Sequence, residues 1–203
     1  MLRIALPKGR MSDESVAYFH ERGVSSIGEF PASRKLIFRD EKSQIEFYLV
    51  RSKDVGTYVE QGACDLGVMG YDLLAEHDFD LLVPGELPFG ECELCVAYAA
   101  ENPDWAKRRN IKVATKYPRL TSRYFFEHGF NIQIIELYGS IEIAPLTGIS
   151  DAIVDLVSTG MTLKENHLLR GETILESSAR LILNKSSYAF KNREIGDILE
   201  KLL

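Results

Sequence analysis

Residues 151–162, DAIVDLVSTGMT, form an apolar run that carries two acids and ends in a turn of small hydroxyl residues and glycine. The apolar run is typical of a buried strand, and the Thr-Gly turn is typical of a strand that passes into a helix. The rest of the chain alternates apolar strand-like runs with amphipathic segments. This alternation predicts an α/β fold with mainly parallel strands.

The same patterns place individual elements along the chain. Short apolar runs predict strands at residues 3–6, 45–50, 66–69, 94–99, 112–114, 132–137, 152–157 and 180–183. Apolar residues at helical spacing predict helices at residues 12–22, 55–61, 121–128 and 194–202.

Two segments of the chain resemble each other. Residues 3–24 are RIALPKGRMSDESVAYFHERGV and residues 112–130 are KVATKYPRLTSRYFFEHGF. Each predicts a strand, a basic loop with a proline, and a helix that closes on an aromatic pair, Glu and Gly. We expect Gly23 and Gly129 to follow their helices in the left-handed conformation. The repeat favours two lobes of similar build, residues 1–92 plus 176–203 and residues 93–175, with a ligand cleft between them. Chance similarity of two strand–helix units is the alternative.

Composition restricts the class of protein. The chain has 203 residues, is 45% hydrophobic and 27% charged, and carries a net charge of −6. These values are ordinary for a soluble globular protein, and the negative charge argues against a nucleic-acid partner. The sequence contains no apolar run of about 18 residues and no signal-peptide core, so we expect a cytoplasmic protein without membrane partners. Cys92 and Cys95 fall on opposite faces of a predicted strand, which disfavours a metal or redox role.

The opening stretch also predicts a binding site. Asp151 and Asp155 are four residues apart and share a face, and carboxylates accept hydrogen bonds from vicinal sugar hydroxyls. Hydroxyls and backbone N–H groups at the start of a helix bind phosphate, and the turn supplies both from Ser158, Thr159, Gly160, Met161 and Thr162. The order suggests a ribose followed by its 5′-phosphate. The alternative is an ordinary turn after a strand whose ends are solvated by acids.

Cations and glycine turns stand at other predicted strand ends. The cations are Lys8, Arg10, Arg34 and Arg51. Guanidinium groups suit a diphosphate because they donate bidentately and stay charged, although any one of these residues is also an ordinary surface cation. Gly70 leads to Asp72, and Gly139 is followed by Ser140 and Glu142. Ser140 is a candidate helix N-cap, and Glu142 is a candidate contact for a base, a metal-bound water or a helix N-terminus.

With these residues assembled, the chain resembles the ATP phosphoribosyltransferase family, which performs the first step of histidine biosynthesis. The resemblance rests on RIALPKGR (3–10), DVGTYVEQGACDLGVMGYDLL (54–74), ATKYPRLTSRYF (114–125), YGSIEIAPLTGISDAIVDLVSTGMTL (138–163) and SARLILN (178–184). It implies two α/β lobes built like type II periplasmic binding proteins. It also implies transfer of the 5-phosphoribosyl group from phosphoribosyl diphosphate to N1 of ATP, with release of diphosphate and help from Mg²⁺.

The resemblance carries implications for assembly as well. The chain stops at Leu203 and looks like the short form of the family. That form pairs catalytic homodimers with a regulatory subunit related to histidyl-tRNA synthetase in a hetero-octamer. Tyr138 and Arg119 depart from residues common in the family, which puts the details of adenine packing in doubt.

The residues and the resemblance together assign the site. Catalytic roles at the phosphates of the leaving group and of ATP go to Lys8, Arg34 and Arg51. ATP binding goes to Arg10, Gly70, Asp72, Gly139, Ser140 and Glu142. Phosphoribosyl diphosphate binding goes to Asp151, Asp155 and residues 158–162. No protein ligand is assigned to Mg²⁺, which we expect to bind mostly substrate and water. A two-lobed solute-binding protein and a regulatory subunit with a decayed site are the competing hypotheses.

Overall fold

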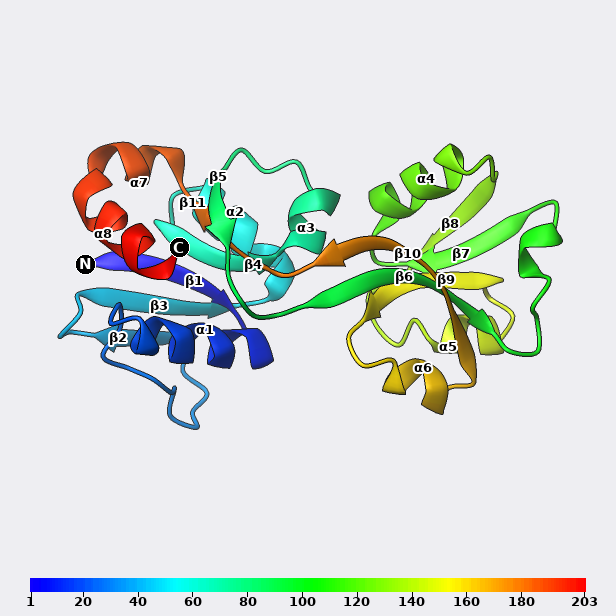
Figure 1. The fold of residues 1–203 in the computed structure, drawn as a ribbon, viewed down its shortest axis with the longest axis horizontal. Coiled ribbons are helices and arrows are strands. Elements are labelled where there is room, and N and C mark those ends of the chain that lie inside the picture. The colour runs from blue at the N-terminus through cyan, green and yellow to red at the C-terminus, as the bar shows by residue number, and fades with distance from the viewer. The chain divides into compact units, whose positions relative to one another are not determined.

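The computed structural model describes residues 1–203, and the chain divides into two compact units (Figure 1). Unit 1 comprises Met1–Gly90 and Ser178–Leu203, and unit 2 comprises Glu91–Ser177. Each unit is a sheet with helices, so the predicted α/β class is confirmed. The ligand cleft between the two units stays a prediction.

Unit 1 is built on a six-stranded sheet of order β2-β3-β1-β4-β11-β5. Its strands are β1 (Leu2–Pro7), β2 (Ile37–Asp40), β3 (Ile45–Val50), β4 (Leu66–Gly70), β5 (Leu82–Glu86) and β11 (Ala179–Leu183). β1 runs parallel to both of its neighbours, β3 and β4. The other pairings of this sheet are antiparallel, and β11 enters between β4 and β5 from the far end of the chain.

Helices cover both faces of this sheet. Its helical segments are α1 (Arg10–Glu21), η1 (Ser52–Asp54), α2 (Val55–Glu60), α3 (Tyr71–Glu76), α7 (Lys185–Phe190) and α8 (Asn192–Leu202). Successive strand residues point to opposite faces. Ile4 and Leu6 of β1 therefore pack in one core with residues of α1 and α8, whereas Ala5 packs in a second core with residues of α2.

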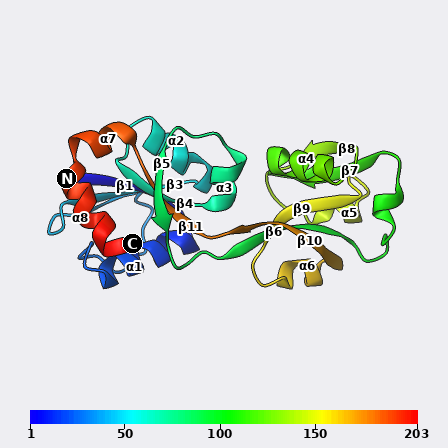
Figure 2. The same ribbon diagram turned by 45° about the horizontal axis from the view of Figure 1, so that its top comes forward.

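Unit 2 has a five-stranded sheet of order β10-β6-β9-β7-β8. Its elements are β6 (Cys92–Ala99), η2 (Trp105–Lys107), β7 (Ile111–Thr115), α4 (Pro118–Glu127), β8 (Ile132–Glu136), α5 (Ile143–Leu146), β9 (Ala152–Val157), α6 (Met161–Glu165) and β10 (Leu168–Ser177). β7, β8 and β9 are parallel, whereas β6 and β10 are antiparallel additions. α5 and α6 pack on one face of the sheet, and α4 lies on the other (Figures 1 and 2).

The expectation of mainly parallel strands is wrong, because the sheets are mixed. Four strand pairings are parallel and five are antiparallel. Four of the five antiparallel pairings involve β6, β10 or β11, the strands next to the two passages of the chain between units, and the fifth joins the consecutive strands β2 and β3 within unit 1. The chain enters unit 2 along β6 and leaves along β10, and these strands pair with opposite directions. The returning β11 is likewise antiparallel to both of its neighbours.

The repeated glycines cap their helices as predicted. Gly23 follows α1 with φ 67° and Gly129 follows α4 with φ 76°. In both places the N–H groups of the glycine and of the next residue donate hydrogen bonds to carbonyls of the helix. After α1, Gly23 donates to His20 and Val24 donates to Phe19. After α4, Gly129 donates to Phe126 and Phe130 donates to Phe125. This is the Schellman arrangement, in which a left-handed residue lets the chain turn back and bond the last carbonyls.

An acid at the amino end of a strand is also repeated. The Asp65 N–H donates to the Arg3 carbonyl at 2.8 Å, and the Arg3 N–H donates to the Asp65 carboxylate at 2.9 Å. Asp151 exchanges the same two bonds with Lys112, at 2.8 Å each. Each acid thus pins the start of its strand to the neighbouring strand.

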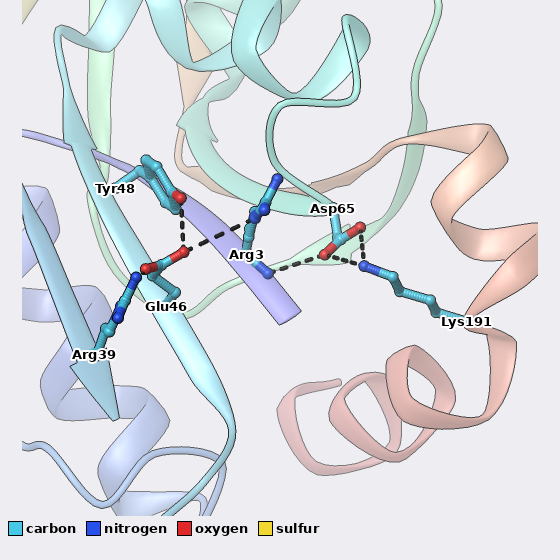
Figure 3. A network of polar contacts seen from close by, with 6 residues as sticks. All are labelled: Arg3, Arg39, Glu46, Tyr48, Asp65 and Lys191. Atoms are coloured by element: carbon cyan, nitrogen blue, oxygen red, sulfur yellow. Dashed lines mark hydrogen bonds and ion pairs between the residues drawn. The ribbon is translucent and has the colours of Figure 1, made fainter. Parts of the chain in front are cut away.

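Asp65 also joins the C-terminal helices to the sheet of unit 1 (Figure 3). Its two oxygens accept from Lys191 Nζ at 2.8 and 2.9 Å, and Ser187 donates at 2.7 Å. Burial alone would raise the pKa of this carboxyl, but the bonds from Lys191, Ser187 and the Arg3 N–H outweigh it and lower the pKa. The ionised carboxylate is therefore part of the folded state.

A second cluster in Figure 3 surrounds Glu46 on β3. Tyr48 donates to Glu46 Oε2 at 2.7 Å, and Arg39 Nε donates to Oε1 at 2.6 Å. These two hydrogen bonds lower the pKa of Glu46. The cluster ties β2 and β3 together at the edge of the sheet.

Candidate functional site

A pocket of about 190 Å³ lies at the carboxyl end of β9 in unit 2. It is lined by Glu142, Asp155, Leu156, Val157, Ser158, Thr159, Gly160, Thr162 and Leu163. Because β7, β8 and β9 are parallel, the segments that follow them meet at one edge of the sheet. The fold therefore brings most of the predicted sugar-phosphate residues together with Glu142, which comes from the segment after β8.

The turn at this pocket begins directly where β9 ends at Val157. Gly160 has φ 73° and stands at the N-cap position of α6. Thr159 Oγ1 accepts weakly from the Met161 N–H at 3.4 Å. Met161 is 64% exposed, and its side chain does not line the pocket. The turn thus places three hydroxyl-bearing residues, Ser158, Thr159 and Thr162, around the pocket, and phosphate binding by this turn stays a prediction.

Asp155 is the carboxylate of β9 that reaches this pocket. Its Oδ1 accepts from the Leu156 N–H at 2.8 Å and lies 3.2 Å from Lys116 Nζ. The Asp155 side chain is 17% exposed and that of Lys116 is 37% exposed. A partly desolvated carboxylate paired with a single ammonium group retains capacity to accept further hydrogen bonds.

Lys116 was not among the residues predicted from the sequence. It follows β7 directly, just as Lys8 follows β1. Lys116 lies two residues beyond the predicted strand at 112–114, just as Lys8 lies two residues beyond the predicted strand at 3–6. The pattern that selects Lys8, a cation near a strand end, therefore selects Lys116 as well.

Asp151 is not part of the pocket, which corrects its assignment to the ribose. The residue precedes β9, so it lies at the opposite end of that strand from the turn at Ser158. A strand rises about 3.3 Å per residue, which separates the two ends by far more than one sugar. Asp151 instead pairs with Arg108 and holds the Lys112 N–H. The spacing of the two acids predicts a shared face, but it does not specify the end of the strand at which each acid lies.

The segment after β8 also differs from its prediction. Ser140 is not an N-cap, because its φ is 47° and α5 begins only at Ile143. Its carbonyl accepts from the Ile143 N–H at 3.2 Å, which closes the turn before α5. Gly139 has open space around it. Glu142 occupies the N-cap position without a side-chain capping bond, and the residue lines the pocket.

Unit 1 has a corresponding carboxyl edge that carries the predicted cations. The Lys8 N–H donates to the Val50 carbonyl at 2.8 Å, so Lys8 and Arg51 leave adjacent parallel strands side by side. The Leu49 N–H donates to the Leu36 carbonyl at 2.8 Å. This bond brings exposed Arg34, two residues before Leu36, toward the same edge. Lys8 and Arg51 thus lie at the ends of β1 and β3, and the segment that carries Arg34 leads toward the same edge.

The remaining predicted ATP residues are divided between the two units. Arg10 opens α1 and pairs with Glu14 at 3.7 Å. Gly70 ends β4, and Asp72 is buried in the first turn of α3. These three residues share the carboxyl edge of unit 1, because β4 is parallel to β1. Gly139, Ser140 and Glu142 belong to unit 2.

Metal ligands are few in this chain. The structure has no group of three or more His, Cys, Asp or Glu side chains placed to hold a metal ion. Two carboxylates, those of Glu142 and Asp155, line the pocket of unit 2. Burial raises the pKa of the Cys64 thiol to about 12, so this cysteine stays protonated.

None of the helices has the length and apolar character needed to cross a membrane.

Comparison with known proteins gives a consistent result. Residues 51–203 match the family model described as HisG, ATP phosphoribosyltransferase. The chain is 46% identical over 202 residues to an ATP phosphoribosyltransferase of Leptospira biflexa, and the match covers 100% of this chain and 99% of that protein.

Solved structures agree on the fold. The structure titled ATP phosphoribosyl transferase (HisG:HisZ) complex from Thermotoga maritima is matched with a TM-score of 0.84 and 34% identity, covering 100% of this chain and 96% of that one. The periplasmic aliphatic sulphonate binding protein SsuA from Escherichia coli is matched with a TM-score of 0.69 and 17% identity, covering 99% of this chain and 70% of that one. The second likeness concerns the fold alone, and it confirms the predicted fold, which is built like that of type II periplasmic binding proteins.

Proposed function

This chain belongs to the ATP phosphoribosyltransferase family, and we propose that its substrates bind along the carboxyl edges of the two sheets. The reaction transfers the 5-phosphoribosyl group of phosphoribosyl diphosphate to N1 of ATP and releases diphosphate, the first step of histidine biosynthesis. Matched relatives have nearly the length of this chain, as the short form of the family has.

The observation that supports this placement most directly is the pocket of unit 2. It combines one carboxylate on β9, Asp155, with the hydroxyl-bearing turn of residues 158–162. Asp155 would accept hydrogen bonds from the ribose hydroxyls, and Ser158, Thr159 and Thr162 would bind the 5′-phosphate. Asp151 is omitted from this proposal because it lies at the other end of the strand.

The chemistry requires positioning and charge stabilisation more than a base. Adenine N1 carries no proton, so the nucleophile needs no deprotonation. The main barrier is cleavage of the bond between ribose C1 and the diphosphate, in which negative charge grows on the leaving group. Cations held on a rigid edge stabilise that charge at little reorganisation cost. Lys8, Arg34 and Arg51 are the candidates, and Arg10, Gly70 and Asp72 would contact ATP beside them.

We propose Mg²⁺ as the metal ion of this reaction. The residues present fit it, since Mg²⁺ commonly uses one or two carboxylates together with substrate phosphates and water. Glu142 and Asp155 are the carboxylates available at the pocket. Bound to the diphosphate, the ion would neutralise part of its charge.

The proposed partners follow from the relatives. A matched solved structure is a HisG:HisZ complex, and a regulatory subunit is therefore proposed for this chain too. We further propose a homodimer of catalytic chains within a hetero-octamer, with the regulatory subunit resembling histidyl-tRNA synthetase. A cytoplasmic location is proposed from the substrate pair, because ATP and phosphoribosyl diphosphate are intracellular metabolites.

The proposed site is tested by turnover measurements on Asp155→Asn. The amide substitution removes the charged acceptor for the sugar, so KM for phosphoribosyl diphosphate should rise by about 10-fold or more while KM for ATP changes little. Asp151→Asn is the matched control, because it changes the same residue type on the other end of β9. It should lower the unfolding free energy and leave KM for both substrates unchanged. An equal loss for both substrates in Asp155→Asn would indicate a folding defect and contradict the assignment.

A further inference from the structure

We propose that Lys116 is a further substrate-binding residue, whose ammonium group leaves Asp155 for a phosphoryl oxygen of phosphoribosyl diphosphate when the sugar binds. This inference rests on the proposed function, because it concerns the same pocket. The inference assigns to the pocket a cation that none of its lining residues supplies. It also predicts that Lys116 exchanges Asp155 for a phosphoryl oxygen when the substrate binds.

The charge of the pocket is the first reason. The residues that line it include two carboxylates, Glu142 and Asp155, and no lysine or arginine. A sugar with a phosphate and a diphosphate is strongly anionic and would be repelled by this lining alone. The Lys116 ammonium group lies 3.2 Å from a lining carboxylate and therefore stands within reach of the pocket.

The geometry of the pair is the second reason. Asp155 Oδ1 bonds both Lys116 and the Leu156 N–H. Ribose hydroxyls that donate to Asp155 Oδ1 would compete with Lys116 for that oxygen. Lys116 is 37% exposed on a flexible stem, so its head has room to move, and it is also 5.3 Å from the centroid of the Tyr117 ring. A compact ammonium group that can be re-aimed suits a phosphoryl oxygen.

The rigid backbone on both sides is the third reason. Thr115 is fully buried, and its hydroxyl donates to the Val154 carbonyl at 2.8 Å. The same hydroxyl accepts from the Tyr117 N–H at 2.9 Å. These bonds hold the residues on either side of Lys116 against the residue before Asp155. Only the lysine side chain has to move for the change of partner.

The experiment measures binding of phosphoribosyl diphosphate with MgCl₂ to the full chain by calorimetry. Lys116→Met should weaken binding by about 10- to 100-fold, the range for losing a hydrogen bond to a charged group. Lys116→Arg should recover part of the affinity because it keeps the charge. Lys112→Met is the matched control: Lys112 is exposed on the same strand and face, but at the opposite end of β7, and its substitution should leave binding unchanged.

Ribose 5-phosphate identifies which phosphoryl group Lys116 contacts. Loss of affinity for both ligands in Lys116→Met assigns the 5′-phosphate, and loss for phosphoribosyl diphosphate alone assigns the diphosphate. Unchanged or tighter binding of both would overturn the inference, since Lys116 would then only occupy Asp155. If Asp155→Asn also binds phosphoribosyl diphosphate normally, the proposed site itself fails. If only Asp155→Asn weakens binding, the site stands and the role of Lys116 is wrong.

Discussion

Arg51 illustrates how the place of a residue next to a strand suggests a role for it. It directly follows β3, next to Lys8, and is exposed, with its backbone carbonyl accepting from the Asp54 N–H at 2.8 Å. The side chain is thus directed from a fixed backbone at the edge where open α/β sheets bind ligands.

Arg51→Ala should lower kcat by roughly 100-fold or more, the scale of losing one group that stabilises transition-state charge. The measurement is the rate of phosphoribosyl-ATP formation at saturating substrates. Arg193→Ala, an exposed arginine on α8, is the control and should keep normal turnover. Normal turnover in Arg51→Ala would remove this residue from the proposed mechanism.

The hydrogen bonds and the ion pair of a second single residue, Asp65, make the free energy of unfolding depend on pH. The folded-state pKa of this carboxyl is lowered, so the group contributes stability above its unfolded value of about 3.9, and the contribution is lost as the pH falls through the folded pKa. Lys191→Met should lower the unfolding free energy at pH 7 by about 1 kcal/mol, because the Lys191 side chain is 40% exposed and partly screened.

The difference between the wild type and Lys191→Met should stay constant from pH 7 to about 5 and narrow below about pH 4. Urea unfolding at several pH values measures it. Lys42→Met, at an exposed position in the same unit, should show no such difference. A difference that is equal at pH 7 and pH 3 would mean that Lys191 acts through packing and not through Asp65.

At the scale of elements, the two strand–helix repeats end in the same way. Gly23 and Gly129 have left-handed backbones, and a Cβ at either position would meet no atom within 4 Å. Glycine is therefore needed at these positions because of the left-handed backbone conformation, and not because a Cβ would clash with a neighbour. The repeat predicted this correctly because a Schellman cap depends on local chain geometry.

Gly23→Ala and Gly129→Ala should each lower the unfolding free energy by about 1 kcal/mol, the cost of a left-handed conformation for alanine. Gly196→Ala is the control with the opposite sign. Gly196 lies inside α8, where a Cβ would also meet nothing, so alanine should raise stability by about 0.5–1 kcal/mol. Chemical denaturation of the three variants measures both effects, and a stabilised Gly129→Ala would contradict the capping role.

Among the edge strands that the sequence patterns missed, β10 is the longest. Its ten residues, LLRGETILES, alternate poorly, contain a glycine and are mostly exposed or half-buried at the sheet edge. An edge strand with one neighbour is specified by its partner more than by its own side chains. β6 supplies that partner along seven register positions, and no local pattern in the sequence encodes it.

At the scale of the whole molecule, the two units differ in how the chain builds them. Unit 2 is one continuous segment, whereas unit 1 needs both ends of the chain. β11 lies between β4 and β5, and Ile195, Ile198 and Leu202 of α8 belong to the core around β1. The C-terminal segment, Ser178–Leu203, therefore completes the sheet and the core of unit 1.

Residues 91–177 expressed alone should fold, because this unit is continuous and has its own sheet and core. Residues 1–90 alone should not, because their sheet would lose β11 from its interior and β5 would lose its only neighbour. Circular dichroism and urea unfolding distinguish the two outcomes. Cooperative unfolding of residues 1–90 would show that the C-terminal segment is dispensable.

Local patterns and long motifs are enough to predict the α/β class, the family, the left-handed glycines and the turn that follows β9. The mixed direction of the strands is visible only in the folded chain, since four of the five antiparallel pairings involve β6, β10 or β11, the strands next to the passages between units. The tertiary structure also separated two acids that share a face, leaving Asp155 beside the pocket and Asp151 at the far end of the strand. The pairing of Asp155 with Lys116 depends on which strands are neighbours, and β7 and β9 are brought together only by folding.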